Sequence, residues 1–65
     1  MAKKLPKGFS VKAVREEKGF VDMYRWAIFK DGLKIKESYA LEDNATDARN
    51  TGIKSLWKGI EDNEL

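Results

Sequence analysis

Few residues of this chain could do chemistry, and none of them comes in a catalytic pattern. The sequence has no histidine and no cysteine, which removes the commonest general base and the thiolate ligands of zinc. Ser10, Ser38 and Ser55 have no base near them in the sequence that could activate a nucleophile. We therefore expect neither an enzyme nor a cofactor.

Three carboxylates stand close together in the second half of the chain. Glu42, Asp43 and Asp47 could supply the oxygen ligands of a magnesium ion. They also lie where a helix is expected to begin, and the positive end of the helix dipole favours acidic side chains there. Helix capping explains their position, so we expect no metal site.

The pattern best suited to binding is a set of basic residues with one aromatic residue among them. Lysine and arginine neutralise phosphates, and an aromatic ring contacts bases or sugars. We predict a nucleic-acid-binding surface, with duplex DNA as its ligand, that consists of Lys12, Arg25, Phe29, Lys34 and Lys36. The same cations would suit a solvated sheet face on which they only aid solubility, and this alternative stays open.

The net charge of +2 is distributed unevenly along the 65 residues. Residues 1–18 carry a net charge of +4, residues 19–41 carry +1, and residues 42–65 carry −3. The half that is expected to form a sheet is therefore basic, and the half that is expected to form a helix is acidic. Such asymmetry suggests a polyanionic partner on one side.

Alternating apolar residues predict three strands, with Tyr24 to Phe29 at the centre of the sheet. The strands are expected at Phe9–Arg15, about Phe20–Lys30 and Leu33–Tyr39, joined by tight turns at Lys18-Gly19 and Asp31-Gly32. With these turns, both hairpins place their apolar residues on the same side of the central strand. That agreement predicts a three-stranded antiparallel meander.

The predicted pairs divide the side chains between two faces. The apolar face carries Phe9, Val11, Ala13, Tyr24, Trp26, Ile28, Leu33, Ile35 and Tyr39. The other face is expected to stay open and to carry basic residues but no acidic one: Ser10, Lys12, Val14, Met23, Arg25, Ala27, Phe29, Lys34, Lys36 and Ser38.

A helix is expected to follow, starting near Asn44 as the N-cap and ending near Gly59. Its apolar stripe consists of Ala45, Ala48, Gly52, Ile53, Leu56 and Ile60. The stripe should cover the apolar sheet face, with Gly52 allowing a close approach over Trp26. The predicted fold class is α+β, a three-stranded antiparallel meander with one C-terminal helix packed on one face, and its buried core should consist of Tyr24, Trp26, Ile28, Ile35, Ile53 and Leu56.

Two charged residues fall on the apolar side in this scheme. Glu37 should lie beside Trp26, and Arg49 lies within the apolar stripe of the helix. We expect Glu37 and Arg49 to pair with each other at the edge of the interface between helix and sheet.

The domain organisation is simple. We expect residues 1–8 to form a flexible arm with Lys3, Lys4 and Lys7, residues 9–61 a single domain, and residues 62–65 an acidic tail. No apolar run approaches the ~20 residues of a membrane span. A domain this small without cysteine is expected in the cytoplasm, as a monomer or a homodimer.

The stretch Trp26-Ala27-Ile28-Phe29-Lys30-Asp31-Gly32, the strand with Lys34 and Lys36, and the helix expected over residues 43–56 resemble a known arrangement. In topology they are similar to the DNA-binding domains of plant ethylene-response factors and to the arm-binding domains of phage and transposon integrases. The resemblance covers residues 9–60 and implies that the exposed sheet face enters the major groove. Double-stranded RNA binding domains begin with a helix instead, for which residues 1–8 are too short.

A second function class stays open beside DNA binding. The chain could be an accessory protein of the kind that phages and mobile elements encode to modulate a protein partner. It would use an edge strand, Phe9–Arg15 or Leu33–Tyr39, or the acidic helix face. Salt separates the two functions, because nucleic-acid binding weakens steeply with salt and strand addition does not.

Overall fold

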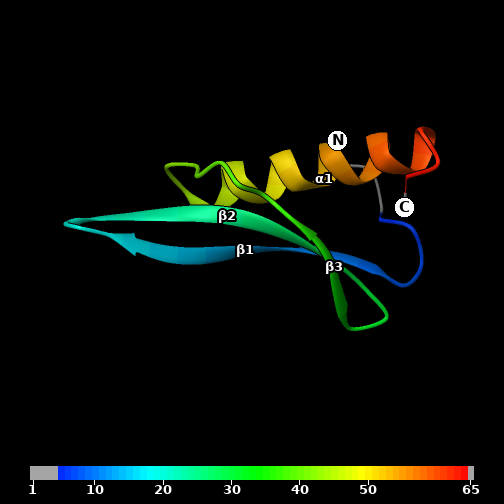
Figure 1. The fold of residues 1–65 in the computed structure, drawn as a ribbon, viewed down its shortest axis with the longest axis horizontal. Coiled ribbons are helices and arrows are strands. Elements are labelled where there is room, and N and C mark those ends of the chain that lie inside the picture. Colours follow the sequence, from blue (N-terminus) through cyan, green and yellow to red (C-terminus); the bar gives the residue numbers. More distant parts are fainter. Residues whose placement is uncertain (1–4, 65) are drawn as a thin grey trace.

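Three strands and one helix make up the structure, a computed structural model that describes residues 5–64 without the side chain of Lys18. In chain order they are β1 (Phe9–Lys18), β2 (Val21–Lys30), β3 (Leu33–Glu37) and α1 (Ala45–Glu61). The strands form one antiparallel sheet in the order β1-β2-β3, and α1 lies along one face of it (Figure 1). The predicted α+β fold is confirmed. Lys3 and Lys4 of the predicted arm lie outside the described residues.

The β1–β2 hairpin is longer than expected, and its register differs by two residues from the prediction. Ten pairs run without irregularity from Phe9–Lys30 to Lys18–Val21, so the turn residues are Gly19 and Phe20. Gly19 supplies the positive φ, 64°, that the first position of such a turn requires. The predicted turn at Lys18-Gly19 is wrong, but a shift of two residues leaves every side chain on its predicted face.

The β2–β3 hairpin has the predicted turn and then departs from the predicted register. Asp31 and Gly32 adopt φ values of 51° and 86°, as a tight two-residue turn requires. Phe29 then lies opposite Lys34, whereas Ile28 lies opposite Lys36. A β-bulge at Ile35 therefore adds one residue to β3.

The bulge exchanges the two faces for the rest of β3, because opposed residues share a face. The predicted turn without a bulge would pair Ile28 with Ile35 and Trp26 with Glu37, and this register is wrong. Lys36 lies on the helix side, and Glu37 lies on the open side, opposite Ala27. Ile35 is exposed instead of buried. Leu33 and Tyr39, also predicted on the apolar face, are 72% and 97% exposed.

The core lies between α1 and the middle of the sheet. Val11, Trp26, Ile28 and Leu56 are buried together, with Ile53 among the half-buried residues packed against them. A Cβ atom on Gly52 would lie 2.7 Å from Trp26 Cβ and 2.7 Å from Val11 Cγ1, so the predicted close approach of the helix is confirmed. Of the predicted core, Trp26, Ile28 and Leu56 are fully confirmed.

The helix begins as predicted and ends later than predicted. Asn44 is the N-cap, and its Oδ1 atom accepts a hydrogen bond of 2.8 Å from the backbone N–H of Asp47. The helix continues through the buried Gly59, so the predicted cap at Gly59 is wrong. Asn63, with φ 59°, takes the left-handed conformation that ends the helix, which asparagine tolerates better than most residues.

Candidate nucleic-acid interface

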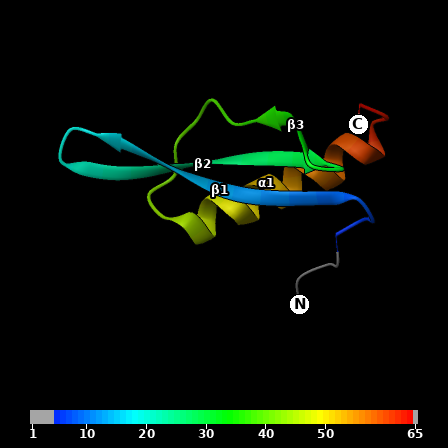
Figure 2. The same cartoon turned by 90° about the horizontal axis from the view of Figure 1, so that it is seen from below.

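Figure 2 shows the sheet from the side that α1 leaves uncovered. The strand pairing arranges the side chains of this face in short rows. One row runs across the three strands as Ser10, Phe29 and Lys34. The next row runs as Lys12, Ala27 and Glu37. Longer side chains in both rows surround Ala27, which has no exposed surface although it lies on the open face.

Phe29 brings two of the predicted binding residues together. The Lys12 Nζ atom lies 5.2 Å from the centre of the Phe29 ring, a cation–π distance. Lys34 lies opposite Phe29 on the neighbouring strand. The structure therefore gathers Lys12, Phe29 and Lys34 at one end of the open face.

Arg25 lies on the same face but is held by carboxylates. It donates from Nε and Nη2 to Glu16 Oε2, at 2.8 Å from Nε, and its Nη1 atom lies 4.0 Å from Glu37 Oε2. The expectation that the open face has no acidic residue is wrong. Glu16 joins the face because β1 extends further than predicted, and Glu37 joins it because of the bulge.

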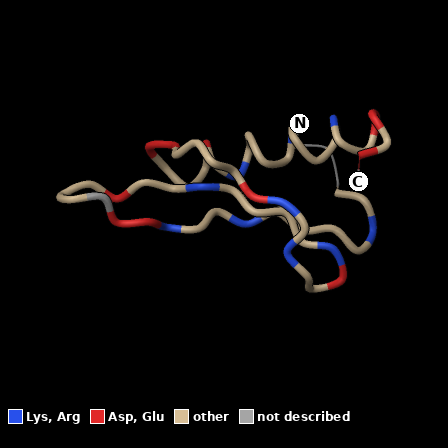
Figure 3. Tube along the Cα trace, in the orientation of Figure 1, with Lys and Arg blue, Asp and Glu red and all other residues tan. Residues whose placement is uncertain are grey.

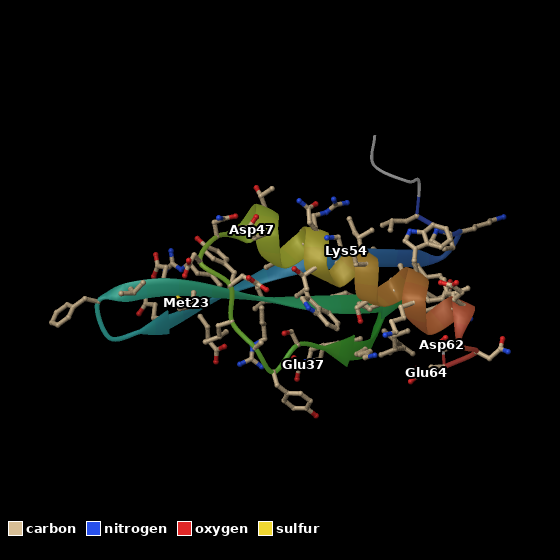
Figure 4. All side chains as sticks on the ribbon, turned by 90° about the horizontal axis from the view of Figure 1, so that it is seen from above. Met23, Glu37, Asp47, Lys54, Asp62 and Glu64 are labelled. Carbon is tan, nitrogen blue, oxygen red and sulfur yellow. The ribbon has the colours of Figure 1, made fainter. Side chains whose placement is uncertain are left out.

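The predicted pair between Glu37 and Arg49 is also wrong. Glu37 Oε2 lies 3.1 Å from Lys34 Nζ and faces the open side of the sheet, whereas Arg49 is an exposed residue of the helix. Figure 4 shows Glu37 on β3, away from the helix residue Lys54.

Two further lysines lie on the helix side at the same end of the sheet. Lys36, which was predicted on the open face, lies opposite Ile28 and is exposed. Lys30 lies opposite Phe9, with its Nζ atom 5.3 Å from the Phe9 ring centre. Sequence reasoning missed Lys30, although the correct register of the first hairpin would have shown it beside an aromatic ring.

These residues form what we call the lysine end of the sheet: Lys12, Lys30, Lys34 and Lys36 with Phe9 and Phe29. Basic positions gather there around the β2–β3 turn, which also carries Asp31 (Figure 3). Within residues 5–64, no carboxylate lies within ion-pair distance of Lys12, Lys30 or Lys36. Lys34 shares Glu37 with Arg25. The lysine end thus offers cations on both faces of one turn.

Two acidic residues near the start of α1, Glu42 and Asp47, accept hydrogen bonds from side chains of the helix and of its N-cap. Asn44 Nδ2 donates to Asp47 Oδ2 at 3.0 Å, and Thr51 Oγ1 donates to Glu42 Oε1 at 3.5 Å. Over the described part of the chain, no three carboxylates come close enough together to hold a metal ion.

No protein-family model, curated protein or solved structure matches this chain. Residues 5–64 contain no helix that is long and apolar enough to cross a membrane.

Proposed function

We propose that this chain is a small non-enzymatic protein that binds duplex DNA through the lysine end of its sheet. The observation that supports the proposal is the placement of four lysines at one end of the sheet, two on each face, with Phe29 beside Lys12 and Lys34 and with Phe9 beside Lys30. Among residues 5–64, Lys12, Lys30 and Lys36 have no carboxylate within ion-pair distance, and Lys34, which is paired with Glu37, is 51% exposed, so these cations are available to neutralise phosphates.

The geometry suits insertion of the β2–β3 turn into a groove. The major groove of B-DNA is about 12 Å wide and admits a two-stranded β-ribbon. Lys12 and Lys34 would then face one wall of phosphates, and Lys30 and Lys36 the other. Phe29, half-buried beneath Lys12, would contact sugars or bases from the open face.

The topological resemblance to ethylene-response-factor and integrase arm-binding domains is consistent with this proposal, but the proposed site differs from the one it implied. The resemblance implied the exposed sheet face as a whole, including Arg25. Here Arg25 is bound by Glu16, so we place the contacts at the lysine end of the sheet instead.

The test is the salt dependence of binding to a fluorescent duplex, measured by anisotropy. Four phosphate contacts predict a slope of log K against log salt of about −3.6, near −0.9 per contact. The double variant Lys12→Ala/Lys34→Ala, and separately Lys30→Ala/Lys36→Ala, should each flatten this slope by about 1.8. Phe29→Ala should weaken binding without changing the slope, because the ring carries no charge.

A matched control comes from the helix. Lys54→Ala/Lys58→Ala removes the same charge from exposed positions outside the lysine end, and it should leave the slope unchanged. The proposal fails if the wild-type protein shows no salt-sensitive binding to any duplex at low salt. It also fails if the helix double variant flattens the slope as much as the two sheet variants do.

A protein partner at β3 is a second candidate, because apolar side chains are exposed there. Leu33, Ile35 and Tyr39 all face solvent, and a shallow hollow of about 360 Å³ is lined by Lys34, Ile35, Lys36, Glu37 and Tyr39. The bulge interrupts the outer edge of β3, so such a partner would bind through side chains. Binding that survives high salt and is lost in Ile35→Ser would support this candidate.

A further inference from the structure

The outer edge of β1 is unusually long and regular for an edge strand. All ten residues of β1 pair with β2 without a bulge, and the strand contains no proline. Edge strands in soluble proteins are commonly short, bulged or interrupted, because a free edge is a template for a further strand.

The pairing pattern identifies which backbone groups of β1 face outward. The Asp31 N–H donates to the Gly8 carbonyl oxygen at 2.8 Å, so the even-numbered residues of this strand are the ones that bond to β2. Val11, Ala13 and Arg15 therefore direct their N–H and C=O groups away from the sheet. Within the described residues, no hydrogen bond reaches these outward groups.

The other edge of the sheet lacks these properties. β3 has five residues, and the bulge at Ile35 breaks the regular spacing of its backbone groups. The contrast selects β1 as the edge that can accept another strand.

We propose that β1 pairs with β1 of a second copy of this chain, antiparallel, about a two-fold axis through Val14. The residues of β1 with outward N–H and C=O groups are odd-numbered, and in such pairing they must lie opposite one another. The numbers of any two opposed residues therefore add to an even number, so the two-fold axis passes through a residue and not between two residues. An axis at Val14 opposes Lys12 to the partner's Glu16, and it does so twice. Opposite charges facing each other across an antiparallel pair are stabilising.

Neighbouring registers are less favourable. An axis at Lys12 would oppose Lys12 to itself, and an axis at Arg15 would oppose Arg15 to itself, and like charges directly opposite are destabilising. An axis at Ala13 brings no charged pair together. The axis at Val14 also places two exposed valine side chains against each other on the open face.

The dimer would be a six-stranded sheet with both helices on the same side. The Glu16 carboxylate, which would face the partner's Lys12 in this dimer, is held in place by a hydrogen bond from Arg25 of its own chain. The inference does not rest on nucleic-acid binding, and every measurement below is made without nucleic acid.

A single cysteine tests the register directly, because the natural sequence contains none. The Cα atoms of a non-hydrogen-bonded pair lie about 4.5 Å apart, within the range that a disulfide spans. Val14→Cys should therefore cross-link into a covalent dimer under mild oxidation. Lys54→Cys, on the exposed side of α1, is the control and should stay monomeric under the same conditions.

Charge reversal gives an independent test in case Val14→Cys fails to fold. Lys12→Glu alone and Glu16→Lys alone should each weaken self-association at least about tenfold, because two attractive pairs become repulsive. An equimolar mixture of the two variants restores both attractive pairs, so it should form a heterodimer as tight as the wild-type dimer. Sedimentation measures both outcomes. The inference is overturned if the wild-type protein sediments as a single 7.5 kDa species at every concentration, or if Val14→Cys cross-links no faster than Lys54→Cys.

Discussion

The basic side chains at the two ends of the sheet have different neighbours. At the β1–β2 end, Arg15 lies 3.0 Å from Glu17 and 3.9 Å from Asp22, and Arg25 is bound by Glu16. At the lysine end, Lys12 and Lys30 lie over phenylalanine rings instead of beside carboxylates. One end is close to internally neutral, whereas the lysines of the other end have fewer carboxylates beside them.

The choice of cation at each end is consistent with this division. The planar guanidinium of arginine donates several hydrogen bonds in a fixed geometry, which suits a network with carboxylates across strands. The lysine ammonium is a flexible point charge that can adjust to a phosphate. The comparison suggests that the arginines link the two strands of the long hairpin, and it agrees with the proposal that the lysines contact phosphates.

The two ends also differ in their support. Leu5, Phe9 and Ile60 pack against the core at the lysine end, whereas the β1–β2 hairpin extends beyond α1 and carries the fully exposed Phe20 at its turn (Figure 1). We therefore expect changes at the hairpin turn to cost much less stability than changes over the core.

The largest expected effect contrasts two aromatic residues of the same hairpin. Trp26→Ala should lower the free energy of unfolding by about 3–5 kcal/mol, because Trp26 is 8% exposed beneath α1. Phe20→Ala should change it by less than about 0.5 kcal/mol, because its ring contacts solvent. Urea denaturation of both variants gives the two values. Equal losses would mean that the projecting end contributes as much to stability as the part of the sheet beneath α1.

The next effect concerns how closely α1 approaches the sheet. Gly52→Ala should destabilise the protein by about 1–3 kcal/mol, because the added methyl group would lie 2.7 Å from both Trp26 Cβ and Val11 Cγ1. This outcome opposes intrinsic helix propensity, which favours alanine by about 1 kcal/mol. Asn50→Ala, at an exposed position of the same helix, is the control and should be neutral or stabilising. A more stable Gly52→Ala protein would contradict the close approach.

The order and type of the elements could be predicted from local patterns. Alternation around Trp26 identified the central strand, the Asp31-Gly32 pair identified its turn, and Asn44 identified the start of the helix. Each of these signals lies within a few residues of the feature that it predicts. The long-range close approach at Gly52 was also predictable, because the stripe of the helix had one face of the sheet to cover.

The residues that make up the candidate site were less predictable, because the strand register decides which side chains lie on each face of the sheet. Nothing in Leu33-Lys34-Ile35-Lys36 signals a bulge, since this segment reads as regular alternation. One extra residue moved Glu37 onto the open face and Lys36 off it. The first strand was expected to end at Arg15, but β1 continues to Lys18, and ion pairs of Arg25 with Glu16 and of Arg15 with Asp22 join β1 to β2 along this extension.

A smaller effect is expected for the ion pair between Arg25 and Glu16 at the β1–β2 end. A double-mutant cycle with Arg25→Gln and Glu16→Gln should give a coupling free energy of about 0.5–1 kcal/mol, the range for a partly exposed pair. The same cycle with Lys34→Gln and Glu37→Gln should give a smaller value, because that lysine is 51% exposed. If the lysine pair couples as strongly as the arginine pair, the two ends do not differ in the way described.

The smallest expected effect is a change in the salt slope of DNA binding, which compares Arg25 with a lysine of the lysine end. Because Glu16 and Glu37 hold Arg25, Arg25→Gln should change the salt slope of DNA binding by less than about 0.3, whereas Lys12→Ala should change it by about 0.9. Both substitutions remove one positive charge from the same face, so the difference reports only whether that charge is available to phosphate. Circular dichroism confirms that both variants remain folded before the anisotropy titrations are compared. Equal changes of slope would show that Arg25 leaves its carboxylates when DNA binds, and the proposed interface would then have to extend from the lysine end across the middle of the sheet.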